Sequence, residues 1–134
     1  MKLTVHVDGG SRGNPGPAAA GAVASNASGE IVGERGELIG EATNNVAEYR
    51  AVLLGAALAA ELGATELALV NDSELIAHQL NGKYKVKHVD MKPLYAEAIA
   101  ALDQFESWSI SCVRREHNEH ADLLVNQTLD AGAL

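Results

Sequence analysis

The spacing of apolar residues changes once along this chain, and that change limits the folds open to it. In the amino-terminal part, strand-like runs at 3–8, 18–25 and 30–38 are separated by two turn-rich segments. Two tight connections in succession favour antiparallel neighbours. From residue 45 to 62, apolar side chains recur at helical spacing, and a glycine follows as a C-terminal cap would. The chain is therefore predicted to begin with a three-stranded meander followed by a helix.

Helices and strands alternate in the rest of the chain. Strands are predicted at 67–70 and 107–114, and helices at 73–80, 93–105 and 118–129. Helical crossovers between strands make those strands parallel. The predicted fold class is α/β, with a five-stranded mixed sheet of three antiparallel and then two parallel strands, flanked by helices. A length of 134 residues fits a single domain.

The composition is that of an ordinary globular protein, with 47% hydrophobic and 21% charged residues. No apolar run is long enough for a signal peptide or a membrane span, so we expect a cytoplasmic protein without membrane partners. Cys112 is the only cysteine, which excludes an intrachain disulfide. Because it alternates with Trp108 and Ile110, it is predicted to be a buried, unreactive thiol.

The net charge of −8 argues against nonspecific binding to nucleic acid, because phosphate contacts need Lys and Arg. Two divalent cations held by four acids would, however, remove half of this deficit. Four of the five lysines fall between positions 83 and 92. A solvated loop would have the same composition.

Four acids stand at predicted element ends: Asp8, Glu48, Asp72 and Asp122. If the fold brings them together, they form an oxygen-only site of the kind that holds hard divalent cations. Each acid also has a local alternative. Glu48 fits a capping box that starts at Asn45, Asp72 could cap the following helix, and Asp122 suits a first helical turn. Acids at one strand end and three helix starts are also how the carboxyl edge of a sheet builds a site.

The glycine-rich turn after Asp8 invites a nucleotide-binding interpretation that its spacing excludes. Gly10, Gly13 and Gly16 are three residues apart, unlike a dinucleotide fingerprint, and no Gly-Lys-Ser/Thr follows. The turn also leads into a strand, so no helix N-terminus is available for a phosphate. A hairpin turn explains the glycines, but not the acid directly before two of them.

Four motifs resemble those of type 1 ribonuclease H, in the same order. They are Asp8–Gly16 (DGGSRGNPG), Thr43–Tyr49 (TNNVAEY), the Asp72–Ser73 pair and Asn118–Asp122 (NEHAD). The resemblance covers nearly the whole chain and implies the ribonuclease H-like fold. It also implies an endonuclease that hydrolyses the RNA strand of RNA–DNA hybrids and leaves 5′-phosphate and 3′-hydroxyl ends. The four acids would bind two Mg²⁺ ions, for which Mn²⁺ could substitute.

The resemblance also assigns substrate contacts. The minor groove of the hybrid would lie along Gly9, Gly10, Ser11, Asn14, Asn44 and Asn45, and Thr43 would help to bind a DNA phosphate. Small polar groups can read the 2′-hydroxyl that distinguishes RNA from DNA. Only five aromatic residues occur, so recognition by base stacking is not expected and little sequence specificity follows.

Two features depart from the well-known bacterial members. Their basic protrusion is reduced here to residues 82–91, in which Lys83, Lys85 and Lys87 are the expected hybrid contacts. Their loop histidine is replaced by His117 and His120, close to the last acid. His117 is the candidate for proton transfer or product release, and an exposed histidine without a role is the alternative.

Other functions fit less well. A domain that only binds nucleic acid or partners would usually have lost one of the four acids. A sugar-kinase-like phosphotransferase also has a first strand ending in Asp-Gly, but it needs a second domain to close over ATP. We expect a monomer, and the chain could also be the nuclease part of a longer polypeptide with a second enzymatic domain.

Overall fold

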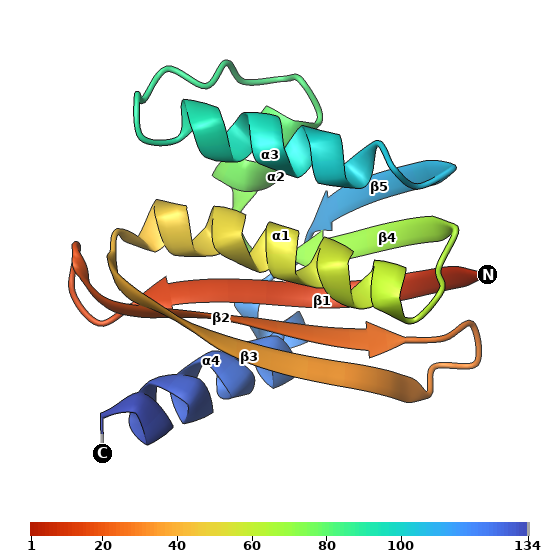
Figure 1. Cartoon of the computed structure of the whole chain (residues 1–134), viewed down its shortest axis with the longest axis horizontal. Coiled ribbons are helices and arrows are strands. Elements are labelled where there is room, and N and C mark those ends of the chain that lie inside the picture. Colours follow the sequence, from red (N-terminus) through yellow and green to blue (C-terminus); the bar gives the residue numbers. More distant parts are fainter. Residues whose placement is uncertain (134) are drawn as a thin grey trace.

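The computed structural model describes residues 1–133, and its centre is one mixed β-sheet (Figure 1). Its strands are β1 (Lys2–Ser11), β2 (Gly16–Ser25), β3 (Ile31–Ala42), β4 (Glu66–Asn71) and β5 (Ser107–Cys112). Their order across the sheet is β3-β2-β1-β4-β5. The first three pair antiparallel, whereas β4 runs parallel to β1 and β5 parallel to β4. The predicted fold class is confirmed.

Helices cover both faces of the sheet. They are α1 (Asn44–Glu61), α2 (Glu74–Leu80), α3 (Lys92–Leu102) and α4 (Glu119–Gly132), with a 3₁₀ turn at Arg115–His117. Helix α1 packs on β1 and β2, and α3 packs mainly on α1 rather than on the sheet. Helix α4 lies against β1, β2 and β3 (Figure 1). None of these helices is long and apolar enough to cross a membrane, as far as residues 1–133 show.

Alternation along β1 decides which side chains meet which helix. Val5 and Val7 are buried against α1, where Gly55 allows close packing, because a Cβ at Gly55 would lie 2.5 Å from a Val7 methyl. The residues of β1 that alternate with these valines face α4 instead, since a Cβ at Gly10 would contact Val125 of that helix. Successive side chains of a strand point to opposite faces. Asp8, two residues before Gly10, therefore lies on the α4 face.

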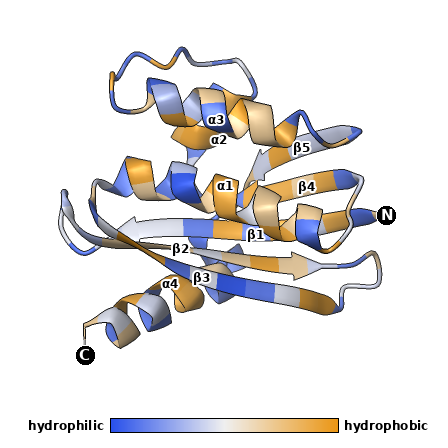
Figure 2. Ribbon diagram, in the orientation of Figure 1, coloured by the Kyte–Doolittle hydropathy of each residue, from blue (hydrophilic) through white to orange (hydrophobic). Residues whose placement is uncertain are grey.

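Several element boundaries differ from prediction because pairing extends the strands. Strand β3 continues past residue 38 to Ala42, where it still pairs with Gly16, so the first turn is only Arg12–Pro15. Helix α3 ends at Leu102 rather than residue 105. In Figure 2 the edge strand β3 carries a long hydrophilic stretch, whereas β4 inside the sheet is largely hydrophobic. Charged side chains on an edge strand oppose pairing with other chains.

The prediction for Cys112 is wrong, because this residue is exposed. It is the last residue of edge strand β5, in which only Ile110 is buried. Partial burial of the sulfur, with Glu74 and Asp72 nearby, raises the pKa of the Cys112 thiol. The thiol is therefore accessible but disfavoured as a thiolate.

Candidate active site

Asp8 lies at the centre of a cluster of acids. Burial, followed by the charge of Asp72 and a side-chain hydrogen bond with Asp122, raises the pKa of Asp8 from 3.8 to about 8. Glu48 contributes a smaller repulsion in the same direction. Asp8, Glu48 and Asp72 also line one cavity of about 10 Å³, which is room for a single water-sized sphere. The fold thus gathers four acids that are up to 114 positions apart.

Glu48 reaches this cluster because a glycine lets α1 begin directly against β1. A Cβ at Gly9 would lie 2.1 Å from the carbonyl oxygen of Ala47 and 2.6 Å from the amide of Glu48. No other residue type fits there without moving the helix. The side chain of Glu48 is held by Asn44, whose Nδ2 donates to Oε1 at 3.1 Å. Burial raises the pKa of Glu48.

Asp72 enters the cluster from the end of β4. It follows Asn71, whose amide donates to the carbonyl of Ser111 and whose Oδ1 accepts from the amide of Ser73. Burial raises the pKa of Asp72, and the nearby guanidinium of Arg115 opposes that effect. Arg115 also acts on Glu48 in the same sense. Sequence reasoning missed Arg115, although it stands only three residues before the Asn118–Asp122 motif.

The helix-capping roles predicted as alternatives for Glu48 and Asp72 are not seen in the structure. The N-cap of α1 is Thr43, whose hydroxyl accepts from the amide of Val46, and Glu48 makes no capping box with Asn45. The N-cap of α2 is Ser73 rather than Asp72. Only Asp122 is placed as its alternative predicted, in the first turn of α4.

The predicted groove residues of the hairpin meet the start of α1. The amide of Ser11 donates to Oδ1 of Asn44 at 3.3 Å, and the amide of Asn44 donates to Oδ1 of Asn14 at 3.1 Å. Because Asn44 also holds Glu48, these three residues form one network beside the acids. Asn45 is exposed next to them, and Gly10 lies against α4.

Thr43 and the lysines do not line the cavity of the acids. Thr43 lines a pocket of about 230 Å³ together with Asn14, Asn45 and His88. Lys83, Lys85 and Lys87 are exposed on the segment between α2 and α3, which forms the long loop beside α3 in Figure 1. These positions suit contacts with a long substrate rather than with its reacting bond.

The two histidines point to different neighbours. His117 lies in the 3₁₀ turn with 69% of its side chain exposed, and its Nε2 is 3.9 Å from Glu116. His120 instead reaches β3, where its Nε2 lies 2.8 Å from Oε1 of Glu34. The structure therefore leaves His117 exposed at the surface beside Glu116 and gives His120 a close partner in β3.

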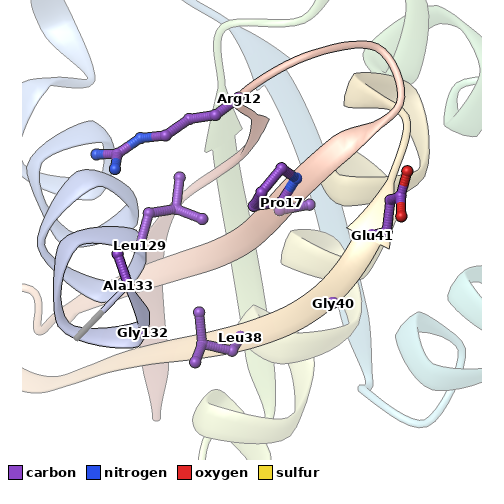
Figure 3. Close-up of a pocket in the computed structure, with 9 residues that line it drawn as sticks. Arg12, Pro17, Leu38, Gly40, Glu41, Leu129, Gly132 and Ala133 are labelled. Carbon is purple, nitrogen blue, oxygen red and sulfur yellow. The ribbon is translucent and has the colours of Figure 1, made fainter.

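An apolar pocket of about 450 Å³ lies elsewhere, between the β2–β3 pair and the end of α4 (Figure 3). Pro17, Leu38 and Leu129 form its walls. At one side, Arg12 forms an ion pair of 2.7 Å with Asp130. The pocket shares no residue with the cavity that the acids line.

The acid cluster has the donor chemistry of a magnesium site. Its side chains offer only carboxylate oxygens. Burial, followed by repulsion from the neighbouring acids, raises the pKa of Asp8, and bound cations would offset both effects. Within residues 1–133, no three His, Cys, Asp or Glu side chains already surround a common point as metal ligands do. Ion binding would thus involve rotation of the carboxylates from the positions described here.

A mixed sheet of this order, with acids gathered at its carboxyl edge, defines the ribonuclease H-like class of proteins. A family model described as "Reverse transcriptase-like" matches residues 6–128. The crystal structure of RNase H1 from Halobacterium salinarum is 42% identical, with a TM-score of 0.96 over 98% of this chain and 99% of that one. The structure of LC11-RNase H1 in complex with an RNA/DNA hybrid is 35% identical, with a TM-score of 0.94 and coverage of 98% and 99%. The chain belongs to the ribonuclease H family, type 1.

Relatives of this family also occur as parts of longer proteins. The bifunctional protein Rv2228c of Mycobacterium tuberculosis is 47% identical over 134 residues, which are 99% of this chain and 37% of the relative. The chain thus spans little more than a third of the length of these mycobacterial relatives. Its similarity is to the N-terminal ribonuclease H domain of that protein, with a TM-score of 0.94.

Proposed function

We propose that this chain is an endonuclease that hydrolyses the RNA strand of RNA–DNA hybrids with little sequence specificity. The products would carry 5′-phosphate and 3′-hydroxyl ends. The observation that carries the proposal is the convergence of four acids around Asp8, whose pKa is raised to about 8. Such a cluster destabilises the fold unless cations or protons compensate it, so a role in binding cations explains its presence.

Asp8, Glu48, Asp72 and Asp122 would hold two Mg²⁺ ions, or Mn²⁺ in their place. Bound there, the ions would activate a water for attack and stabilise the leaving oxygen. The residues of the chain hold this arrangement in place: Asn44 fixes the Glu48 carboxylate, and Asn71 orders the turn that carries Asp72. Arg115 supplies a fixed positive charge beside two of the acids, suited to a phosphate oxygen.

The hybrid would be bound along the hairpin and the start of α1. Ser11, Asn14 and Asn44 present small polar groups next to Glu48, as reading of a 2′-hydroxyl requires. The backbone at Gly9 and Gly10 would follow the same groove, although Gly9 is also required for packing.

The flanking contacts are less central to catalysis. Thr43, with Asn45 beside it, would bind a phosphate of the DNA strand in the 230 Å³ pocket. Lys83, Lys85 and Lys87 would contact the hybrid further along. The exposed His117 would pass protons or help to release the cut strand. A monomeric state, a cytoplasmic location and a second enzymatic domain in the natural polypeptide stay predictions.

The test is cleavage of labelled RNA–DNA hybrid, double-stranded RNA and double-stranded DNA, each with Mg²⁺, Mn²⁺ or EDTA. We expect cutting of the RNA strand of the hybrid alone, and none in EDTA. Asp72→Asn preserves shape and removes one charge from a buried acid, so its melting temperature should not fall while cleavage falls at least ~100-fold. Equal loss of folding and activity would instead favour a purely structural role for Asp72.

A further inference from the structure

Asn118 is a buried asparagine that joins the start of α4 to β1. Only 1% of it is exposed. Its Nδ2 donates to the carbonyl oxygen of Val7 at 2.9 Å, across 111 positions of sequence. Val7 is the residue directly before Asp8, and it lies one residue beyond the last β1 residue that pairs with β4. The amide of Asn118 thus supplies a donor to β1 where the ladder with β4 has ended.

Because its side chain bonds to Val7, Asn118 does not cap α4 in the usual way. Asn118 is the N-cap of α4, where an asparagine oxygen normally accepts from the first helical amides, yet its side chain makes no cap bond. Its Oδ1 is buried and has no hydrogen-bond partner in the part of the chain described. The opposite amide orientation would set two oxygens against each other at Val7, so the donor must face β1. A buried acceptor without a partner destabilises the fold.

The same residue also contacts the last acid. The amide of Asp122 donates to the backbone carbonyl of Asn118 at 3.2 Å. Asn118 therefore contacts the backbone beside Asp8 with its side chain and that of Asp122 with its main chain. Helix α4 is seated closely here, because a Cβ at Gly21 of β2 would lie 2.9 Å from the carbonyl oxygen of Ala121.

From these contacts we propose that Asn118 is a positioning residue that sets the separation of Asp8 and Asp122, and through it the affinity for divalent cations. This inference rests on the function proposed above. Asn118 touches neither the substrate nor the ions. It acts by fixing two ligands that come from opposite ends of the chain, as partners of metal ligands do in other sites.

The test compares Asn118→Ala and Asn118→Ser with Asn81→Ala. Asn81, the exposed C-cap residue of α2, also donates from its Nδ2 to a backbone carbonyl, that of Ile110 in β5, at 3.3 Å, but away from the acids. Two quantities are measured: the rise in melting temperature with Mg²⁺ in the absence of substrate, and kcat and KM on hybrid over a range of Mg²⁺ concentrations. The first measurement does not depend on catalysis.

We expect Asn118→Ala to need at least ten-fold more Mg²⁺ in both measurements, a range typical of partners of metal ligands. Its KM for hybrid at saturating Mg²⁺ should stay within two-fold of the parent value. Asn118→Ser keeps a shorter donor, so its Mg²⁺ requirement should lie between those of the parent and Asn118→Ala. The serine variant also provides the test if the alanine variant does not fold. Asn81→Ala should melt at a lower temperature with an unchanged Mg²⁺ requirement.

An unchanged Mg²⁺ requirement in folded Asn118→Ala or Asn118→Ser would overturn the inference. Asn118 would then only stabilise the fold, as is expected of Asn81. If the parent chain cleaves no hybrid and gains no stability from Mg²⁺, the proposed function itself fails. These two outcomes are distinct, because the first leaves the parent active.

Discussion

Replacing Asp8 with asparagine should stabilise the cation-free protein while abolishing its activity. In the folded state, burial and three neighbouring acids raise the pKa of Asp8 from 3.8 to about 8. The unfolded chain lacks these neighbours, so its Asp8 ionises near the ordinary value. Between these two pKa values the unfolded state binds fewer protons, and the stability of the parent falls as the pH rises. The Asp8→Asn variant carries no ionisable group at this position, so it avoids this loss.

The size of the effect follows from the two pKa values. At pH 7 the pH lies about 3 units above the ordinary pKa of Asp8, and each unit corresponds to about 1.4 kcal/mol. The upper limit of the gain in the free energy of unfolding is therefore about 4 kcal/mol. The side-chain amide of the variant is also desolvated, and the remaining acids relax, so we expect a gain of about 1–3 kcal/mol. For a domain of this size, that raises the melting temperature by roughly 4–12 °C.

The assay is thermal unfolding followed by circular dichroism in EDTA, from pH 4 to pH 8. The difference between Asp8→Asn and the parent should be small at pH 4, because the carboxyl group is protonated in the folded parent and only partly ionised in the unfolded chain. It should then grow up to about pH 8, the folded-state pKa. Adding Mg²⁺ should stabilise the parent more than the variant. Glu97→Gln on the exposed face of α3 is the control and should change stability by less than about 0.5 kcal/mol.

Two results would refute this reasoning. One is an Asp8→Asn variant no more stable than the parent in EDTA at pH 7. The other is a gain in stability that does not depend on pH, because the gain must disappear at a pH low enough to protonate Asp8 in both the folded and the unfolded parent.

Three further predictions concern the rest of the site. Replacing Lys83, Lys85 and Lys87 with alanine should raise KM for hybrid and flatten the salt dependence of KM, while kcat is kept. A lower kcat at unchanged KM would contradict substrate binding by these lysines. His117→Ala should slow multiple turnover more than about ten-fold. His120→Ala should lower the free energy of unfolding by less than about 1 kcal/mol and change activity little. Equal rates in both variants and the parent would leave His117 without a role. Gly9→Ala should destabilise the fold by about 3 kcal/mol or more in chemical denaturation, because its Cβ would collide with the carbonyl of Ala47. A well-folded Gly9→Ala variant would show that α1 can shift.

The fold was predictable because each segment has a clear periodicity. Alternation along β1 and helical spacing along α1 specify local structure, and tight turns or helical crossovers then decide strand direction. The candidate acids were predictable because each stands near a predicted element end and within a motif that resembles those of type 1 ribonuclease H, although β1 in fact continues past Asp8 to Ser11. Cys112 was not, because alternation shows that a strand has two faces but not that the strand lies at the edge of the sheet.

Contacts between distant segments could not be read from the sequence. Gly9 was predicted to follow a substrate groove, whereas the structure shows that its missing Cβ admits the start of α1. The capping box at Asn45 matched a common pattern, yet the N-cap of α1 is Thr43, two residues earlier. The partner of Asn118 is 111 positions away, and nothing in its own motif points to Val7.

The position of α4 has a consequence for synthesis of the protein on the ribosome. Strands β1–β4 and helix α1 emerge first and can pair with one another, but the last acid arrives only with α4, which must then dock on β1, β2 and β3. Contacts of such long sequence separation form late. We therefore expect nascent chains stalled before α4 has emerged to bind divalent cations weakly and to leave RNA intact. The catalytic centre would then be completed only when the whole domain has left the exit tunnel.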